Sequence, residues 1–169
     1  MESRVVGRGG LALMLPVVEK GRALPLAWRV RHRPTGHGPE ALHIAMGERM
    51  SPVRPEGVTV VLRGEGACDG TALQAPRNEV GWSSVCRTAL RTTATWEGEP
   101  LRREAFGTCL QPGQLMALPE VYSTRAASGP IRVLCCGAKG EQAPRELVSH
   151  LAPAEETGRL YPKRFHIEM

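Results

Sequence analysis

Glu65 is the first residue whose position could support chemistry. It follows the run VTVVL (residues 58–62) and Arg63-Gly64, and that β-branched run predicts a buried central strand at 58–63. In open α/β sheets, ligands and metal ions bind beyond the carboxyl ends of such strands. A carboxylate at this place could hold a cation. The alternative is an ordinary turn carboxylate in a glycine-rich loop.

A second group of reactive side chains lies near the C-terminus, in the segment YPKRFHIE. On a helix, Tyr161, Arg164 and Glu168 would lie at about 0°, 300° and 340°, so a phenol, a guanidinium and a carboxylate would share one face. The alternative is a surface Arg–Glu pair, which contributes only a few tenths of a kcal/mol. Pro162 disfavours a regular helix through this segment.

Positive charge is concentrated at the N-terminal end. Residues 1–33 hold seven basic and two acidic residues, and the difference of five equals the net charge of +5 of the whole chain. Arg29, Arg31 and Arg33 alternate along a predicted strand, with Trp28 and Val30 on its other face. Such asymmetry indicates a polyanionic partner such as nucleic acid, and the alternative is a solvated basic face.

The elements that must position these residues are short. Apolar runs predict strands near 11–18, 23–31, 58–63, 82–88 and 131–136, the first two forming an antiparallel pair. A helix is expected after Pro39, with Leu42, Ala45, Met46 and Met50 at helical spacing, and another from Pro153. Residues 89–128 suggest small β-hairpins. Strands and helices thus mix along the chain, which predicts an α/β or α+β fold with a mixed sheet and helices.

Composition excludes several classes of protein. No apolar run approaches the ~18 residues that a membrane-spanning helix needs, so no membrane partner is expected. The five cysteines are odd in number and form no C-x-x-C pair, which favours a reduced, cytoplasmic protein. Cys135 and Cys136 should point to opposite faces of a strand.

The spacing Tyr161-x-x-Arg164-x-x-x-Glu168 resembles the start of the Y-(2)-R-(3)-E-(6)-K signature of the DDE transposases of bacterial insertion sequences. Further segments resemble the catalytic domain of that group, in the same order: VVGRGGLALML, GRALPLAWRV, VTVVLRGEGACDGTAL and GWSSVCRT. The resemblance covers essentially the whole chain. It implies one RNase H-like domain over residues 1–169, a mixed sheet flanked by helices, with a β-rich insertion at about 89–128 before the last acidic residue.

The resemblance also implies a catalytic site. In this family, three carboxylates hold two divalent ions, Mg²⁺ or Mn²⁺, that promote cleavage and joining of DNA strands. Carried over by motif, the metal-binding and catalytic acids are Glu2, Glu65 and Glu168. Tyr161 and Arg164 would contact transposon-end DNA, and Arg29, Arg31 and Arg33 would add phosphate contacts.

The sequence also departs from the family pattern. The first two family acids are aspartates, whereas Glu2 and Glu65 are glutamates, whose extra methylene displaces metal-bound oxygens. The signature lysine would fall after Met169, and the family's N-terminal DNA-end-binding region would precede Met1. We therefore expect a truncated or decayed, inactive transposase fragment. The alternatives are a non-catalytic DNA- or partner-binding remnant that interferes with full-length transposase, and an unrelated small basic enzyme. The partners that the first two interpretations imply besides DNA are full-length transposase or further copies of this chain in a homo-oligomer.

Overall fold

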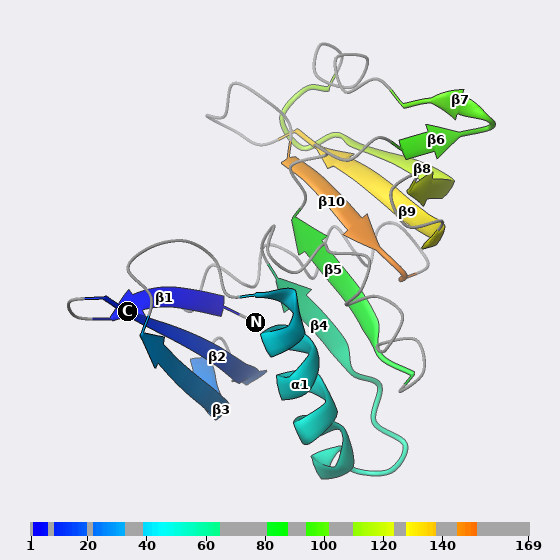
Figure 1. The fold of residues 1–169 in the computed structure, drawn as a ribbon. Coiled ribbons are helices and arrows are strands. Elements are labelled where there is room, and N and C mark those ends of the chain that lie inside the picture. Colours follow the sequence, from blue (N-terminus) through cyan, green and yellow to red (C-terminus); the bar gives the residue numbers. More distant parts are fainter. Residues whose placement is uncertain are drawn as a thin grey trace.

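The computed structural model describes two sheets and one α-helix, connected in a mixed α/β arrangement that is rich in strands (Figure 1). The fold class predicted from the sequence is confirmed at this level. The residues described are 2–6, 9–19, 22–32, 39–64, 81–87, 94–101, 110–123, 128–137 and 145–151.

The N-terminal strands form a three-stranded antiparallel sheet in the order β1-β2-β3. Along β2, alternate residues are buried as far as Leu15, which is the pattern of a strand with one face toward a core. The predicted antiparallel pair of strands near 11–18 and 23–31 is confirmed, and a third strand joins it. The bounds are β1 Glu2–Val6, β2 Gly10–Glu19 and β3 Arg22–His32.

Helix α1 (Glu40–Met50) begins directly after Pro39, as the sequence predicts, and runs into the short 3-10 helix η1 (Ser51–Val53). Leu42 and Met46 are one turn apart and both are buried, which confirms this part of the predicted apolar stripe. Ala45, which the sequence predicts in the same stripe, is exposed, so the buried face of α1 does not extend to it.

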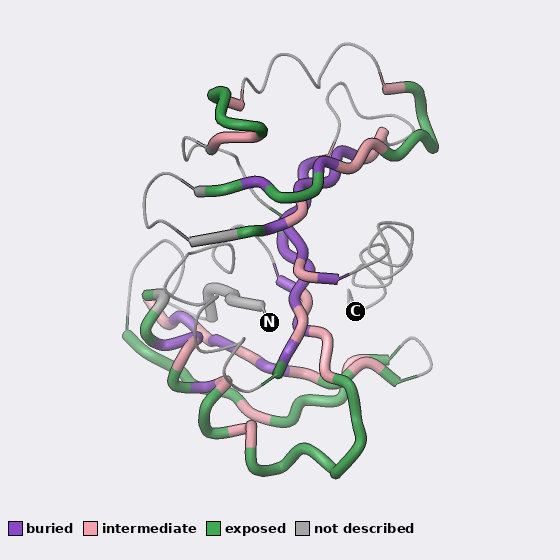
Figure 2. Tube along the Cα trace, turned by 90° about the vertical axis from the view of Figure 1, so that its right-hand side faces the viewer, coloured by how far each residue is buried: buried purple, intermediate pink, exposed green. Residues whose placement is uncertain are grey.

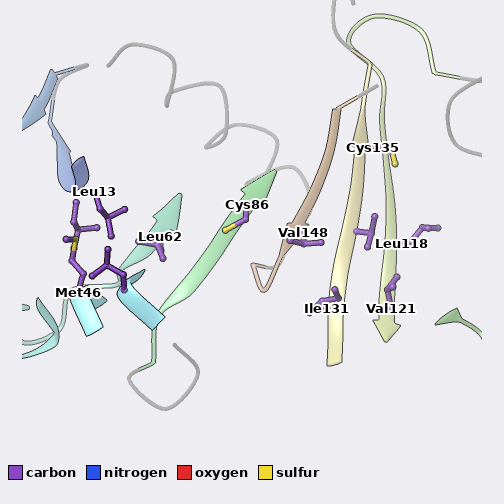
Figure 3. Packing of buried hydrophobic residues seen from close by; sticks show 12 residues of the cluster. Leu13, Met46, Leu62, Cys86, Leu118, Val121, Ile131, Cys135 and Val148 are labelled. Carbon is purple, nitrogen blue, oxygen red and sulfur yellow. The ribbon is translucent and has the colours of Figure 1, made fainter. Parts of the chain in front are cut away.

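Strands β4 (Val61–Gly64) and β5 (Ser83–Arg87) pair in parallel, with Val61 opposite Ser83. Strand β4 is shorter than the predicted strand at 58–63, and it lies at the edge of the seven-stranded sheet of order β4-β5-β10-β9-β8-β6-β7. The prediction of a central strand is therefore wrong. Leu62 is buried because α1 and the β2 leucines pack over it, and not because strands flank it on both sides (Figure 3).

The middle of the larger sheet is antiparallel. Strand β10 (Arg145–Ser149) lies between β5 and β9 (Ser128–Cys136), and β9 in turn pairs with β8 (Leu115–Ser123). The predicted strand at 131–136 is confirmed within β9. Strand β10 was not predicted, because its sequence RELVS carries three polar residues.

At the far end of this sheet, β6 (Ala94–Trp96) and β7 (Glu99–Pro100) form a hairpin. Its two turn residues, Glu97 and Gly98, have φ angles of 53° and 83°, as a two-residue hairpin turn requires. This hairpin and β8 lie within the range 89–128 where small hairpins are expected. That this range is an insertion in a single domain stays a prediction.

Buried side chains hold the two sheets together. One apolar cluster extends from β2 and α1 through β4 and β5 to β10, β9 and β8 (Figure 3). A smaller cluster covers the other face of the larger sheet, around Val85, Leu134, Leu147 and Leu151. Burial is concentrated in the middle of the molecule, whereas β3 is exposed along most of its length (Figure 2). The larger cluster contains Leu13, Leu15, Leu42, Met46, Leu62, Cys86, Leu118, Val121, Ile131, Val133, Cys135 and Val148.

Two expectations concern helices. The predicted helix from Pro153 lies outside the described residues. In the described part of the chain, α1 is the one α-helix, so helices on both faces of the sheet stay a prediction. A search of the described helices finds none that is long and apolar enough to cross a membrane.

Candidate nucleic-acid interface

Strand β3 carries the predicted basic side chains at the edge of the three-stranded sheet. Arg29 and Arg31 are both exposed, and they are opposite Leu13 and Leu11 of β2. Residues two apart on a strand lie on the same face, so the two guanidinium groups share one side of β3. This part of the prediction is confirmed. Arg33, the third member of the predicted row, lies outside the described residues.

The other face of β3 is apolar and also exposed. Trp28 is 67% exposed and Val30 is 61% exposed, and they lie opposite Met14 and Ala12 of β2. Guanidinium groups can pair with phosphates and an exposed tryptophan can stack on a base. On β3 these two kinds of group lie on opposite faces, so only the Arg29 and Arg31 face is a candidate for phosphate contact.

Of the three predicted catalytic acids, only Glu2 lies within the residues that the structure describes. Glu2 is the first residue of β1, and its backbone pairs with Met14 of β2. Glu65 follows directly on the last residue of β4, and both it and Glu168 lie outside the described residues, as do Tyr161 and Arg164. The structure therefore leaves the convergence of the three carboxylates as a prediction. No group of three metal-ligating side chains occurs within the described ranges.

Arg63 is a basic residue near the predicted site that the sequence analysis did not single out. It lies in β4, two residues before Glu65, and its backbone is opposite Val85 of β5. Burial lowers the pKa of the Arg63 guanidinium, yet an arginine remains charged at neutral pH. The signal was present in the sequence, because Arg63 is the one charged residue directly after the apolar run VTVVL.

Ser84 and His150 form a polar pair in the larger sheet. The Ser84 Oγ lies 3.0 Å from the His150 Nδ1, and the backbone N–H of His150 donates to the carbonyl oxygen of Ser84 at 3.2 Å. A serine beside a histidine can form a nucleophile, but the Ser84 side chain is only 3% exposed. A substrate could not reach its hydroxyl, so the pair joins β5 to β10.

The described cysteines are also poor nucleophiles. Cys86, Cys135 and Cys136 are free thiols, and the side chains of Cys86 and Cys135 are buried. Burial, followed by the negative charges of Glu146 and Cys136, raises the pKa of the Cys135 thiol to about 12. A thiol in this state is protonated at neutral pH and is inert.

No protein-family model matches the chain, and no curated protein matches it. Functional inference therefore rests on the geometry of the described residues. Those residues bring Arg29 and Arg31 together on one face of β3, with Trp28 and Val30 on the other.

Proposed function

We propose that the chain is an RNase H-like, DDE-transposase-type domain that binds DNA and in which metal-dependent strand cleavage is impaired. The observation that carries the proposal is the succession of its first elements. Three antiparallel strands are followed by helix α1, then β4, then a strand parallel to β4. The resemblance to DDE transposases implies a mixed sheet with helices, and this succession of strands and a helix fits that expectation.

A shared core supports this proposal. In the described residues β1 ends the smaller sheet and β4 ends the larger one, and the two strands do not pair with each other. Leu13 of β2 and Leu62 of β4 nevertheless belong to one apolar cluster, which fits the single domain that the resemblance implies.

The position of the extra strands fits the same proposal. Strands β6 to β10 follow β5 in the chain and precede Glu168. The resemblance expects a β-rich insertion at this point, before the last acidic residue. Because β10 pairs with β5, these strands extend the sheet and need no separate core.

The residues that would hold metal ions are Glu2, Glu65 and Glu168. Carboxylate oxygens are the hard ligands that Mg²⁺ and Mn²⁺ prefer, so the donor types fit these ions. A bound pair of ions would supply activation of the attacking oxygen and stabilisation of the leaving oxygen. Glutamate replaces aspartate at the first two positions, and its longer side chain displaces the carboxylate, so we expect cleavage to be weak or absent.

DNA contact is the part of the function that the described residues support best. Arg29 and Arg31 are exposed on one face of β3, which is an edge strand within the described residues, and phosphates could pair with them there. Arg33, Tyr161 and Arg164 are proposed to extend this contact. A purely DNA-binding role, without cleavage, is the second candidate function, and Arg29 and Arg31 favour it.

A nicking assay on supercoiled plasmid, with Mg²⁺ or Mn²⁺, separates these possibilities. We expect no metal-dependent nicking by the chain as it is, and measurable nicking by the double variant Glu2→Asp with Glu65→Asp. Adding Glu168→Ala to the double variant should abolish that nicking. If the double variant binds DNA but never nicks it, the DNA-binding role stands and the impaired-nuclease role fails.

Failure of both activities would overturn the whole proposal. The decisive result would be a folded protein with no DNA binding at low salt and no nicking by any variant. Nicking by the unchanged chain that is lost in Glu168→Ala would instead establish a working nuclease, and would contradict the impairment that we assign to Glu2 and Glu65.

A further inference from the structure

The outer edge of β3 is a free strand edge within the described residues. Strand β3 is last in the order β1-β2-β3, and within the described residues no strand pairs with its outer side. All of its eleven residues are exposed except Ala23 and Ala27, which are partly buried (Figure 2). An unpaired strand edge presents a row of backbone N–H and C=O groups, which can template another strand.

The side chains of β3 protect its edge only in part, because exposed apolar residues alternate with Arg29 and Arg31. Charges and prolines normally prevent strand addition, and Pro25 does interrupt the first half of β3. Residues 26–32 contain no proline. They carry three large apolar side chains that are exposed by 47% or more, namely Leu26, Trp28 and Val30.

Charge is distributed asymmetrically over the same residues. Arg29 and Arg31 alternate with Trp28 and Val30, and β3 contains no acidic residue. One face of the edge is therefore cationic and the other is apolar. A strand added to this edge would place its alternate side chains against these two faces.

We propose that residues 26–32 of β3 dock an extended peptide strand in which acidic residues alternate with apolar ones. The peptide backbone would pair with the free edge of β3. Its acidic side chains would meet Arg29 and Arg31, and its apolar side chains would cover Trp28 and Val30. This is strand addition with specificity from alternate side chains.

The described charges disfavour a second copy of this chain as the occupant. Pairing β3 with another β3 would bring two strands that each carry Arg22, Arg29 and Arg31 and no acid, and like charges across a strand pair are destabilising. DNA is a poorer fit to the full edge, because phosphates can pair with the arginines but offer no strand backbone to the row of N–H and C=O groups. Arg29 and Arg31 would be shared with phosphates, so DNA and peptide would compete.

The test uses the full chain and a short blocked peptide of alternating Glu and Val, measured by fluorescence anisotropy and by amide hydrogen exchange. We expect saturable binding and slower exchange at the amides of residues 26–32. A peptide of the same composition with its Glu residues grouped in one block should bind about tenfold more weakly, which corresponds to ~1.4 kcal/mol. N-methylation of alternate peptide amides should abolish binding, because it removes the backbone donors.

A charge exchange provides the matched control. The double variant Arg29→Glu with Arg31→Glu should bind the Glu peptide about tenfold more weakly, a loss of ~1.4 kcal/mol, and gain affinity for a Lys–Val peptide. Arg49→Glu with Arg54→Glu makes the same change in net charge at exposed positions outside β3, and should leave binding unchanged. Equal binding of the alternating and grouped peptides would overturn the proposal. The proposal would also be overturned if DNA, or self-association at high protein concentration, protected the amides of residues 26–32 while the alternating peptide did not.

Discussion

Cys135 and Glu146 are direct cross-strand partners in the β9–β10 ladder, and both are buried, at 1% and 5% exposure. Burial raises the pKa of the Cys135 thiol to about 12, and the carboxylate of Glu146 contributes to the rise. A carboxylate beside a thiol in this position opposes formation of a second negative charge. Because of this pair, we expect the stability of the protein to fall at high pH.

The first prediction concerns this sensitivity. The unfolded thiol ionises near its ordinary pKa of 9.0, whereas the buried Cys135 keeps its proton until about pH 12. The native state therefore binds more protons in this window, and the free energy of unfolding falls as the pH rises from about 9 to about 12. Below pH 9 this contribution is fully present. Urea unfolding at about pH 8 and about pH 10.5 measures the fall.

Cys135→Val provides the comparison that isolates this thiol, because valine has a similar volume and does not titrate. The fall in unfolding free energy between the two pH values should be smaller in the variant than in the unchanged chain. An equal fall in both proteins would assign the effect to other groups.

A second prediction contrasts two glycines. Gly137 packs against the turn Gln111–Gln114, where its N–H donates to the Gln114 carbonyl oxygen at 3.0 Å. A Cβ at Gly137 would overlap the backbone carbonyl of Gln111. Gly137→Ala should therefore destabilise the protein by about 1–3 kcal/mol, as overpacking does.

The substitution Gly47→Ala should raise the free energy of unfolding, whereas Gly137→Ala should lower it. Gly47 lies inside helix α1, and a Cβ there would be 3.9 Å from the ring of Trp82, an ordinary contact. Gly47→Ala should stabilise by about 0.5–1 kcal/mol, because alanine loses less backbone entropy in a helix. Urea unfolding of the two variants measures both effects, and a stabilising Gly137→Ala would contradict the described position of the turn.

The third prediction tests whether the two sheets share one core. Leu13 of β2 is fully buried in the cluster that reaches β10, β9 and β8. Leu13→Ala should lower the free energy of unfolding by about 2–5 kcal/mol. Leu26→Ala, at a position 47% exposed on β3, should change it far less. The unfolding of Leu13→Ala should remain a single transition by circular dichroism and by tryptophan fluorescence, and two separate transitions would show that the sheets unfold independently.

The fourth prediction concerns DNA. Binding should weaken steeply with salt, because each phosphate contact releases condensed counterions. Arg29→Ala with Arg31→Ala should reduce the slope of log K against log salt by about 1.8 on duplex DNA, if both arginines contact phosphates. Arg49→Ala with Arg54→Ala removes the same charge elsewhere on the surface. An equal loss of slope in both pairs of variants would mean that overall charge, and not the β3 face, drives the binding.

The sequence by itself determined the elements whose signal is local. The apolar runs of β2, β3 and β9 and the helix after Pro39 could be predicted, because alternation, spacing and turn residues act within a few positions of the chain. The alternation of Arg29 and Arg31 against Trp28 and Val30 was predictable for the same reason. A period of two fixes which side chains share a face wherever the segment is extended.

Only the tertiary structure decided where strands lie within a sheet. The polar sequence of β10 gives no strand signal, yet β10 lies between β5 and β9, and Glu146 is buried there by its neighbours. The apolar run before Glu65 suggested a central strand, yet β4 is an edge strand whose Leu62 is covered by α1. Sheet position depends on pairing between segments far apart in the chain, and residue types within one segment do not encode that pairing.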